Sequence, residues 1–213
     1  MNNRVTIIDY GLGNIYSVKR ALEVSGAMNV TICERGEDLV QSEKIILPGV
    51  GAFGDGMNGL RERGLLEPLK KAAREGKPIL GICLGMQLLA STGEEFGVHE
   101  GLSLIPGSVQ AIPKLSVDGR QLKVPYIGWS KLTLGQSQPA DHNCLVEARQ
   151  KAVYLVHSFQ FLTSKPEHLL ACYEYGGHQI TAAVRNDNVF GVQFHPEKSG
   201  LVGLNILKNF ISW

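Results

Sequence analysis

In the first 90 residues, short runs of apolar, β-branched side chains alternate with longer stretches in which apolar side chains recur every three or four positions. The short runs predict buried strands at residues 5–8, 30–33, 44–47 and 78–82. The longer stretches predict three helices, at residues 14–25, 60–75 and 84–90. Gly64 and Pro68 are expected to break the second of them. Strands that are apolar throughout are typical of a parallel sheet covered on both faces.

From residue 107 to residue 183 the pattern changes to shorter candidate strands, such as 152–156 and 169–172, separated by Pro, Gly, Asn and Asp. This part is better explained by hairpins or an antiparallel extension than by further alternation of parallel strands and helices. A last strand is predicted at residues 189–194, and a closing helix at 200–213 has an apolar stripe of Leu201, Leu204, Leu207 and Ile211. We therefore expect an α/β fold in one domain, residues 1–213, with an open, mostly parallel central sheet, helices on both faces and an antiparallel extension.

Composition, net charge and cysteine spacing argue against several classes of protein function for this chain. A chain of 213 residues with 44% hydrophobic content can bury a full core. Its 21 basic and 20 acidic residues give a net charge of +1, which offers no electrostatic case for nucleic acid or a membrane surface. No stretch approaches the ~18 apolar residues of a membrane span. The four cysteines lack Cys-x-x-Cys spacing, so we expect a reduced, cytoplasmic protein, and we expect neither a metal nor a cofactor.

The first candidate for chemistry is Cys83, within Gly-Ile-Cys-Leu-Gly between a predicted strand and a predicted helix. This spacing is typical of a nucleophile elbow, whose sharp turn crowds the backbone at both glycines. The turn would place Cys83 at a helix N-terminus, which favours a thiolate, and would aim the backbone N–H of Leu84 at a reacting carbonyl. A buried structural cysteine between two packing glycines is the alternative.

A cysteine nucleophile that cleaves an amide needs a partner to protonate the leaving amine. Of six histidines, only His195 follows a strongly apolar strand and stands beside a carboxylate, in His195-Pro196-Glu197. Pro196 favours extended geometry at His195, and positions i and i+2 of an extended segment project to the same side. We therefore expect Glu197 to hold one imidazole nitrogen while the other faces Cys83.

A glycine-rich loop, Pro-Gly-Val-Gly-Ala-Phe-Gly at residues 48–54, follows the third predicted strand. Its Gly-x-Gly-x-x-Gly spacing matches the dinucleotide fingerprint, which supports a rival hypothesis of a nicotinamide or flavin oxidoreductase. The same loop can instead present backbone N–H groups of Gly49, Val50 and Gly51 to an oxyanion beside Cys83. We favour the second interpretation, because the loop opens with Pro48 and follows the third strand rather than the first.

The segment Gly-Ile-Cys-Leu-Gly-Met-Gln around Cys83, together with His-Pro-Glu at 195–197, resembles the class I (triad) glutamine amidotransferases. Further motifs that resemble this family fall in order along the chain, at residues 9–14, 47–54, 101–107, 156–158 and 191–199. Within the class, the set is similar to the glutaminase subunits of imidazole glycerol phosphate synthases. The resemblance implies a flavodoxin-like sheet.

The resemblance also implies a reaction. Cys83 would attack the side-chain amide of glutamine to give a glutamyl thioester and ammonia, His195 would protonate the ammonia and then activate water, and Glu197 would orient His195. The N–H of Leu84 and the loop at 49–51 would hold the oxyanion after a peptide reorients. Contacts to glutamine would come from Gln87, Glu95, His157, Ser158 and Phe159.

Free ammonia protonates at neutral pH and then ceases to be a nucleophile, so it must pass directly to an acceptor site. The resemblance places that site on a cyclase subunit with a (β/α)₈ barrel, which forms imidazole glycerol phosphate and AICAR in histidine biosynthesis. Asn14, Tyr126 and Trp129 would lie near this heterodimer interface, with Trp129 as a gate; an ordinary core tryptophan is the alternative.

Two segments depart from the usual pattern of this subfamily. Pro-Tyr-Ile-Gly-Trp-Ser stands at 125–130 in place of Pro-His-Met-Gly-Trp-Asn, and Phe159 stands in place of tyrosine. Neither departure touches the triad. They leave open a paralogue that feeds ammonia to a cyclase-like enzyme amidating a surface sugar. A degenerate regulatory subunit is a further alternative, against which the complete triad argues.

Overall fold

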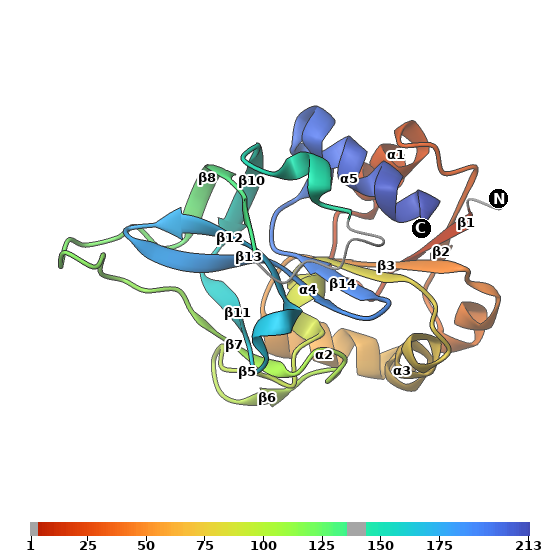
Figure 1. Ribbon diagram of the computed structural model, residues 1–213. Helices are drawn as coiled ribbons and strands as arrows, with labels where there is room; N and C mark the ends of the chain where they lie inside the picture. The colour runs from red at the N-terminus through yellow and green to blue at the C-terminus, as the bar shows by residue number, and fades with distance from the viewer. Residues whose placement is uncertain (1–3, 136–143) are drawn as a thin grey trace.

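The computed structural model describes residues 4–135 and 144–213 (Figure 1). Its central sheet contains β1 (Arg4–Ile8), β2 (Asn29–Cys33), β3 (Lys44–Gly49), β4 (Ile79–Cys83), β9 (Thr133–Leu134), β12 (Leu169–Tyr175), β13 (His178–Asn186) and β14 (Val189–Val192). The strand order is β2-β1-β3-β4-β14-β13-β12-β9. The first five strands in this order pair in parallel and the last three pair antiparallel, so the mostly parallel sheet is confirmed.

Helices cover both faces of this sheet (Figure 1). One face carries α1 (Ile15–Val24) and α5 (Gly200–Ser212), and the other carries α2 (Phe53–Glu62), α3 (Leu66–Arg74) and the short α4 (Leu84–Leu88). Successive side chains of β3 join different cores: Ile46 packs in the cluster of α1 and α5, whereas Ile45 and Leu47 pack in the cluster of α2 and α3. Burial on both faces explains why the central strands β3 and β4 are almost entirely apolar.

Two smaller sheets extend the fold, and most of their strands lie after residue 107, where the sequence pattern predicts an antiparallel extension. One pairs β8 (Tyr126–Lys131) with β10 (Ala152–His157), antiparallel. The other has the order β11-β7-β5-β6, from β5 (Thr92–Gly93), β6 (His99–Glu100), β7 (Gly107–Ala111) and β11 (Phe159–Thr163). Short 3₁₀ helices are present at η1 (Gly36–Gln41), η2 (Val146–Ala148), η3 (Pro166–His168) and η4 (Pro196–Lys198).

The helix predicted at 60–75 is wrong in detail. Gly64, with a φ of +63°, separates α2 from α3, but α2 already begins at Phe53 inside the glycine-rich region. Pro68 does not break α3, because it is the third helical residue, where no intrahelical N–H bond is needed. The apolar stripe predicted for the last helix is also shifted, because Leu201 is 79% exposed. The buried side of α5 is formed by Gly203, Ile206, Leu207, Phe210 and Ile211.

Within residues 4–135 and 144–213, no helix is both long enough and apolar enough to span a membrane. All four cysteines are free.

Candidate active site

Cys83 is the last residue of β4 and directly precedes α4, in a strained backbone conformation with φ +54° and ψ −112°. Such a conformation costs a non-glycine residue on the order of 1–3 kcal/mol and persists only where the surroundings enforce it. A Cβ added to Gly81 would lie 2.6 Å from the carbonyl oxygen of Gly85, and one added to Gly85 would lie 1.7 Å from that of Leu47. Both glycines are therefore required by the close approach of backbone to backbone in a nucleophile elbow.

His195 follows β14, and its Nδ1 lies 2.8 Å from Oε1 of Glu197. The expected extended segment is only partly present: His195 is extended, but residues 196–198 form the 3₁₀ turn η4, and this turn brings Glu197 back to the ring. Ser199 fixes the backbone here. Its hydroxyl donates to the His195 carbonyl at 2.7 Å and accepts from the backbone N–H of Tyr154 on β10 at 3.0 Å.

The environment of His195 favours its protonated form. Burial opposes the charge, but interactions with Cys83 and with Glu197 outweigh it and raise the pKa of His195 to about 9. Its Nε2 is buried and has no hydrogen-bond partner among the residues that the structure describes. A charged imidazole beside the Cys83 sulfur, with one uncommitted N–H, is suited to give a proton to a leaving amine.

Gln193 is a member of this site that the sequence reasoning missed. It is 0% exposed, its amide nitrogen donates to Sγ of Cys83 at 3.7 Å, and its Oε1 accepts from Nε2 of Gln87 at 3.0 Å. Gln87 also donates to the carbonyl of Phe159 at 3.3 Å. The available signal was a single amide side chain inside the otherwise apolar run at 189–194, two residues before His195.

The loop expected to hold the oxyanion lies beside the nucleophile. Gly49 is the register partner of Cys83 across β3 and β4, Val50 is half-exposed, and Gly51 has a φ of +113°. Leu84 is the first residue of α4, so its N–H is one of the donors that a helix start leaves without an intrahelical partner.

The same loop does not offer the open backbone that a dinucleotide fingerprint uses. A Cβ added to Gly49 would lie 1.9 Å from the hydroxyl oxygen of Tyr10, and one added to Gly54 would lie 2.8 Å from the ring of His99. Gly54 is also already within α2. These glycines are explained by close packing against side chains, which removes the basis of the oxidoreductase hypothesis.

Two of the expected glutamine contacts are occupied within the protein. One carboxylate oxygen of Glu95 accepts from the backbone N–H of Phe53 at 2.9 Å, where α2 begins. The ring of His157 is buried, and burial lowers its pKa to about 4, so the ring is neutral. Its Nδ1 donates to the carbonyl of Phe159 at 2.7 Å, and its Nε2 accepts from the Tyr173 hydroxyl at 2.8 Å.

The other expected contacts lie where β10 passes into β11. The carbonyl of Ser158 accepts from the backbone N–H of Ile112 at 2.9 Å, just beyond β7. Phe159 accepts from both Gln87 and His157 through its carbonyl. The His157 ring thus positions the backbone of this turn, and Gln87 links the turn to α4.

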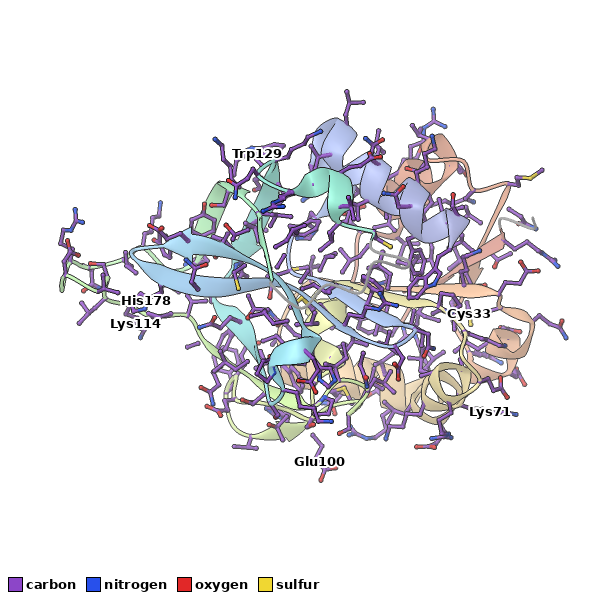
Figure 2. All side chains as sticks on the ribbon, viewed as in Figure 1. Cys33, Lys71, Glu100, Lys114, Trp129 and His178 are labelled. Carbon is purple, nitrogen blue, oxygen red and sulfur yellow. The ribbon has the colours of Figure 1, made fainter. Side chains whose placement is uncertain are left out.

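The three residues expected near a partner lie at the surface or close to it. The side chain of Asn14 caps α1 by accepting from the backbone N–H of Ser17 at 3.2 Å. The Tyr126 hydroxyl lies 2.6 Å from Oγ of Ser130. Trp129, labelled on β8 in Figure 2, is 56% exposed, so it is not a core tryptophan.

Trp129 is connected to the active site through one ring. Its ring centroid lies 5.9 Å from that of Tyr154, and the Tyr154 centroid lies 6.5 Å from that of His195. This aromatic contact series joins an exposed position on β8 to the catalytic candidate.

The sequence pattern of the family described as Glutamine amidotransferase class-I matches residues 6–213. Among curated relatives, "Imidazole glycerol phosphate synthase subunit HisH 1" of Legionella pneumophila is 46% identical over 97% of this chain and 98% of its own length. "Imidazole glycerol phosphate synthase subunit HisH" of Geobacillus thermodenitrificans is 44% identical over 97% of this chain and 94% of its own.

Solved structures agree with the fold. "Structure of PurLQS from Thermotoga maritima" superposes with a TM-score of 0.72 at 23% identity, covering 100% of this chain and 97% of that one. The Trypanosoma brucei "CTPS - glutaminase domain with bound acivicin" gives a TM-score of 0.65 at 16% identity, covering 98% and 91%. With the family pattern spanning residues 6–213 and two relatives above 40% identity, the chain belongs to the class-I glutamine amidotransferase family.

Proposed function

We propose that this chain is the glutaminase subunit of an imidazole glycerol phosphate synthase, acting as a single domain in the cytoplasm. The observation that carries the proposal is the strained Cys83 elbow beside a charged, buried His195 that is hydrogen-bonded to Glu197. The names of the relatives at 44% and 46% identity support the choice of synthase within the family.

The geometry suits hydrolysis through a thioester. The sulfur of Cys83 attacks the side-chain carbonyl carbon of glutamine, and the N–H of Leu84 with the loop at 49–51 stabilises the oxyanion. Collapse breaks the C–N bond as Nε2 of His195 gives its proton to the leaving nitrogen, which departs as ammonia. Neutral His195 then takes a proton from water, whose oxygen attacks the thioester; the C–S bond breaks and glutamate leaves.

Recognition of glutamine as an amino acid needs a negative group for its ammonium and donors for its carboxylate. We assign the ammonium to Glu95, whose second carboxylate oxygen is not used by Phe53. We assign the carboxylate to backbone groups of the turn at 157–159, whose shape is fixed by the hydrogen bonds of His157 and Gln87. This assignment uses His157 as a support for the turn.

The ammonia has to reach an acceptor before it protonates. We propose delivery to a cyclase subunit with a (β/α)₈ barrel, docked near Asn14, Tyr126 and Trp129, which forms imidazole glycerol phosphate and AICAR. A second candidate is a paralogue that supplies a cyclase-like enzyme amidating a surface sugar. It is favoured by the Tyr126–Ser130 hydrogen bond at 2.6 Å, because both residues depart from the subfamily pattern and satisfy one another.

The test is to co-purify the partner and to assay the complex with glutamine or ammonium as nitrogen source. We expect glutamine-dependent formation of imidazole glycerol phosphate, with glutamate released in equal amount. Amidation of a sugar acceptor instead would favour the second candidate, and failure of the complex to hydrolyse glutamine would overturn the proposal.

A further inference from the structure

Tyr10 lies just after β1 and has a buried hydroxyl group that nothing else in the fold explains. The residue is 1% exposed, and its hydroxyl oxygen has no hydrogen-bond partner within the described part of the chain. Burying an unpaired hydroxyl lowers the stability of the fold. Such a group therefore needs an explanation, such as a hydrogen bond that it makes in another state of the catalytic cycle.

The position of this hydroxyl points to the oxyanion loop. It occupies the space in which a side chain of Gly49 would begin, 1.9 Å from an ideal Cβ, and Gly49 is the register partner of Cys83. Burial, then the nearby charges of Cys83 and Asp9, raise the pKa of Tyr10, so the group remains a neutral O–H donor.

The loop contains a peptide that could use this donor. The carbonyl of Gly49 and the N–H of Val50 belong to one planar peptide and point in opposite directions. A rotation that turns the Val50 N–H toward a substrate oxygen at Cys83 therefore turns the Gly49 carbonyl away from Cys83, where it needs a new donor.

We propose that the Tyr10 hydroxyl is a positioning group that holds the oxyanion loop in its catalytic orientation by donating a hydrogen bond to the Gly49 carbonyl. The inference rests on the proposed function, because it requires an oxyanion at Cys83. Tyr10 stays unpaired in the resting loop and becomes paired in the reoriented loop, so its burial favours the active orientation at the expense of the resting one.

The test is Tyr10→Phe, which removes the hydroxyl and keeps the ring. In complex with the partner, we expect kcat for glutamine hydrolysis to fall about tenfold, the effect of losing one buried hydrogen bond, while KM stays within about twofold. Ammonium-dependent turnover by the partner should not change. The thermal midpoint should be equal to or above that of the parent, because the resting state loses an unpaired buried hydroxyl.

Two further measurements separate positioning from a structural role. Alkylation of Cys83 by iodoacetamide forms no oxyanion, so its rate should be the same in parent and Tyr10→Phe. Tyr173→Phe is the matched control: the Tyr173 hydroxyl is paired with His157, so its removal should lower the thermal midpoint.

Parental kcat in Tyr10→Phe would overturn the inference while leaving the proposed function intact. A lower kcat accompanied by slower alkylation and a lower thermal midpoint would overturn it as well, because all three changes together indicate a distorted core. A parent complex without glutaminase activity would overturn the proposed function first, and this inference with it.

Discussion

The amide nitrogen of Gln193 donates a hydrogen bond to the sulfur of Cys83 across 3.7 Å, from a side chain with no exposed surface. The contact joins the residue that follows β14 to the last residue of β4, and these two strands are neighbours in the sheet. An N–H directed at sulfur stabilises a developing or existing negative charge there, and low surrounding dielectric strengthens the effect. Gln193 therefore links the segment after β14 to the nucleophile through a direct hydrogen bond.

Gln193→Leu should slow glutamine hydrolysis about five- to tenfold and slow alkylation of Cys83 by iodoacetamide at pH 7, because the sulfur loses its donor. The variant should also lose about 1–3 kcal/mol of unfolding free energy, since the Gln87 amide loses the Gln193 oxygen as its acceptor. Steady-state kinetics and urea unfolding measure both effects. Unchanged alkylation would show that Gln193 supports the core without acting on the sulfur.

Replacing Cys83 itself separates chemistry from backbone strain. Cys83→Ala and Cys83→Gly should both abolish glutamine hydrolysis and leave ammonium-dependent turnover by the partner intact. Only glycine tolerates a φ of +54° with a ψ of −112° at little cost, so Cys83→Gly should be about 1 kcal/mol more stable than Cys83→Ala. Denaturant unfolding of the two variants checks this order, and equal stability would mean that the elbow relaxes once the sulfur is gone.

Trp129 provides a test of coupling between the surface and the site. Trp129→Ala should change the free energy of unfolding by less than about 1 kcal/mol, because the side chain is half-exposed. It should nevertheless reduce the rate of glutamine hydrolysis in the complex with the partner several-fold, since Tyr154 lies between its ring and His195. Leu201→Ala, an exposed position on α5, is the matched control and should keep the parental rate in the complex. Equal rates in both variants would show that Trp129 is not coupled to the site.

The parallel strands and the elbow could be predicted from sequence because their signals are local. Residues 45–47 and 78–82 are apolar without interruption, and the two glycines around Cys83 are required by close contacts with residues a few positions away and with the adjacent strand. The start of α2 could not be predicted in the same way. Its first backbone N–H, that of Phe53, is satisfied by Glu95, 42 residues away, and Ala52 provides no side-chain cap.

The site shows the same division. His195 and Glu197 are two residues apart, so their contact was predictable even though the connecting turn is 3₁₀. The hydrogen bonds of the His157 ring to Tyr173, and of Gln193 to Gln87, depend on segments that meet only in the folded chain. The motif identifies His157 as a member of the site without saying which of its atoms remain free, and it does not single out Gln193.

The raised pKa of His195, about 9 against 6.5 for an ordinary histidine, gives a prediction with a definite sign. The folded protein keeps this proton over a range in which the unfolded chain has already lost it. The stabilisation from His195 is therefore fully present below about pH 6.5 and is lost as the pH rises through about 9, by at most about 1.4 kcal/mol per pH unit. The thermal unfolding midpoint of the parent should accordingly fall between pH 7 and pH 9.

Cys83→Ala is the control for this dependence, because it removes one of the two residues that raise the pKa of His195 and keeps the other, Glu197. Its His195 ring should titrate at a lower pH than the parent in NMR spectra, and its stability should fall less between pH 7 and pH 9. Identical titration in the two proteins would mean that Glu197 alone holds the proton. The carboxylate, and not the nucleophile, would then keep His195 protonated for proton transfer to the leaving nitrogen.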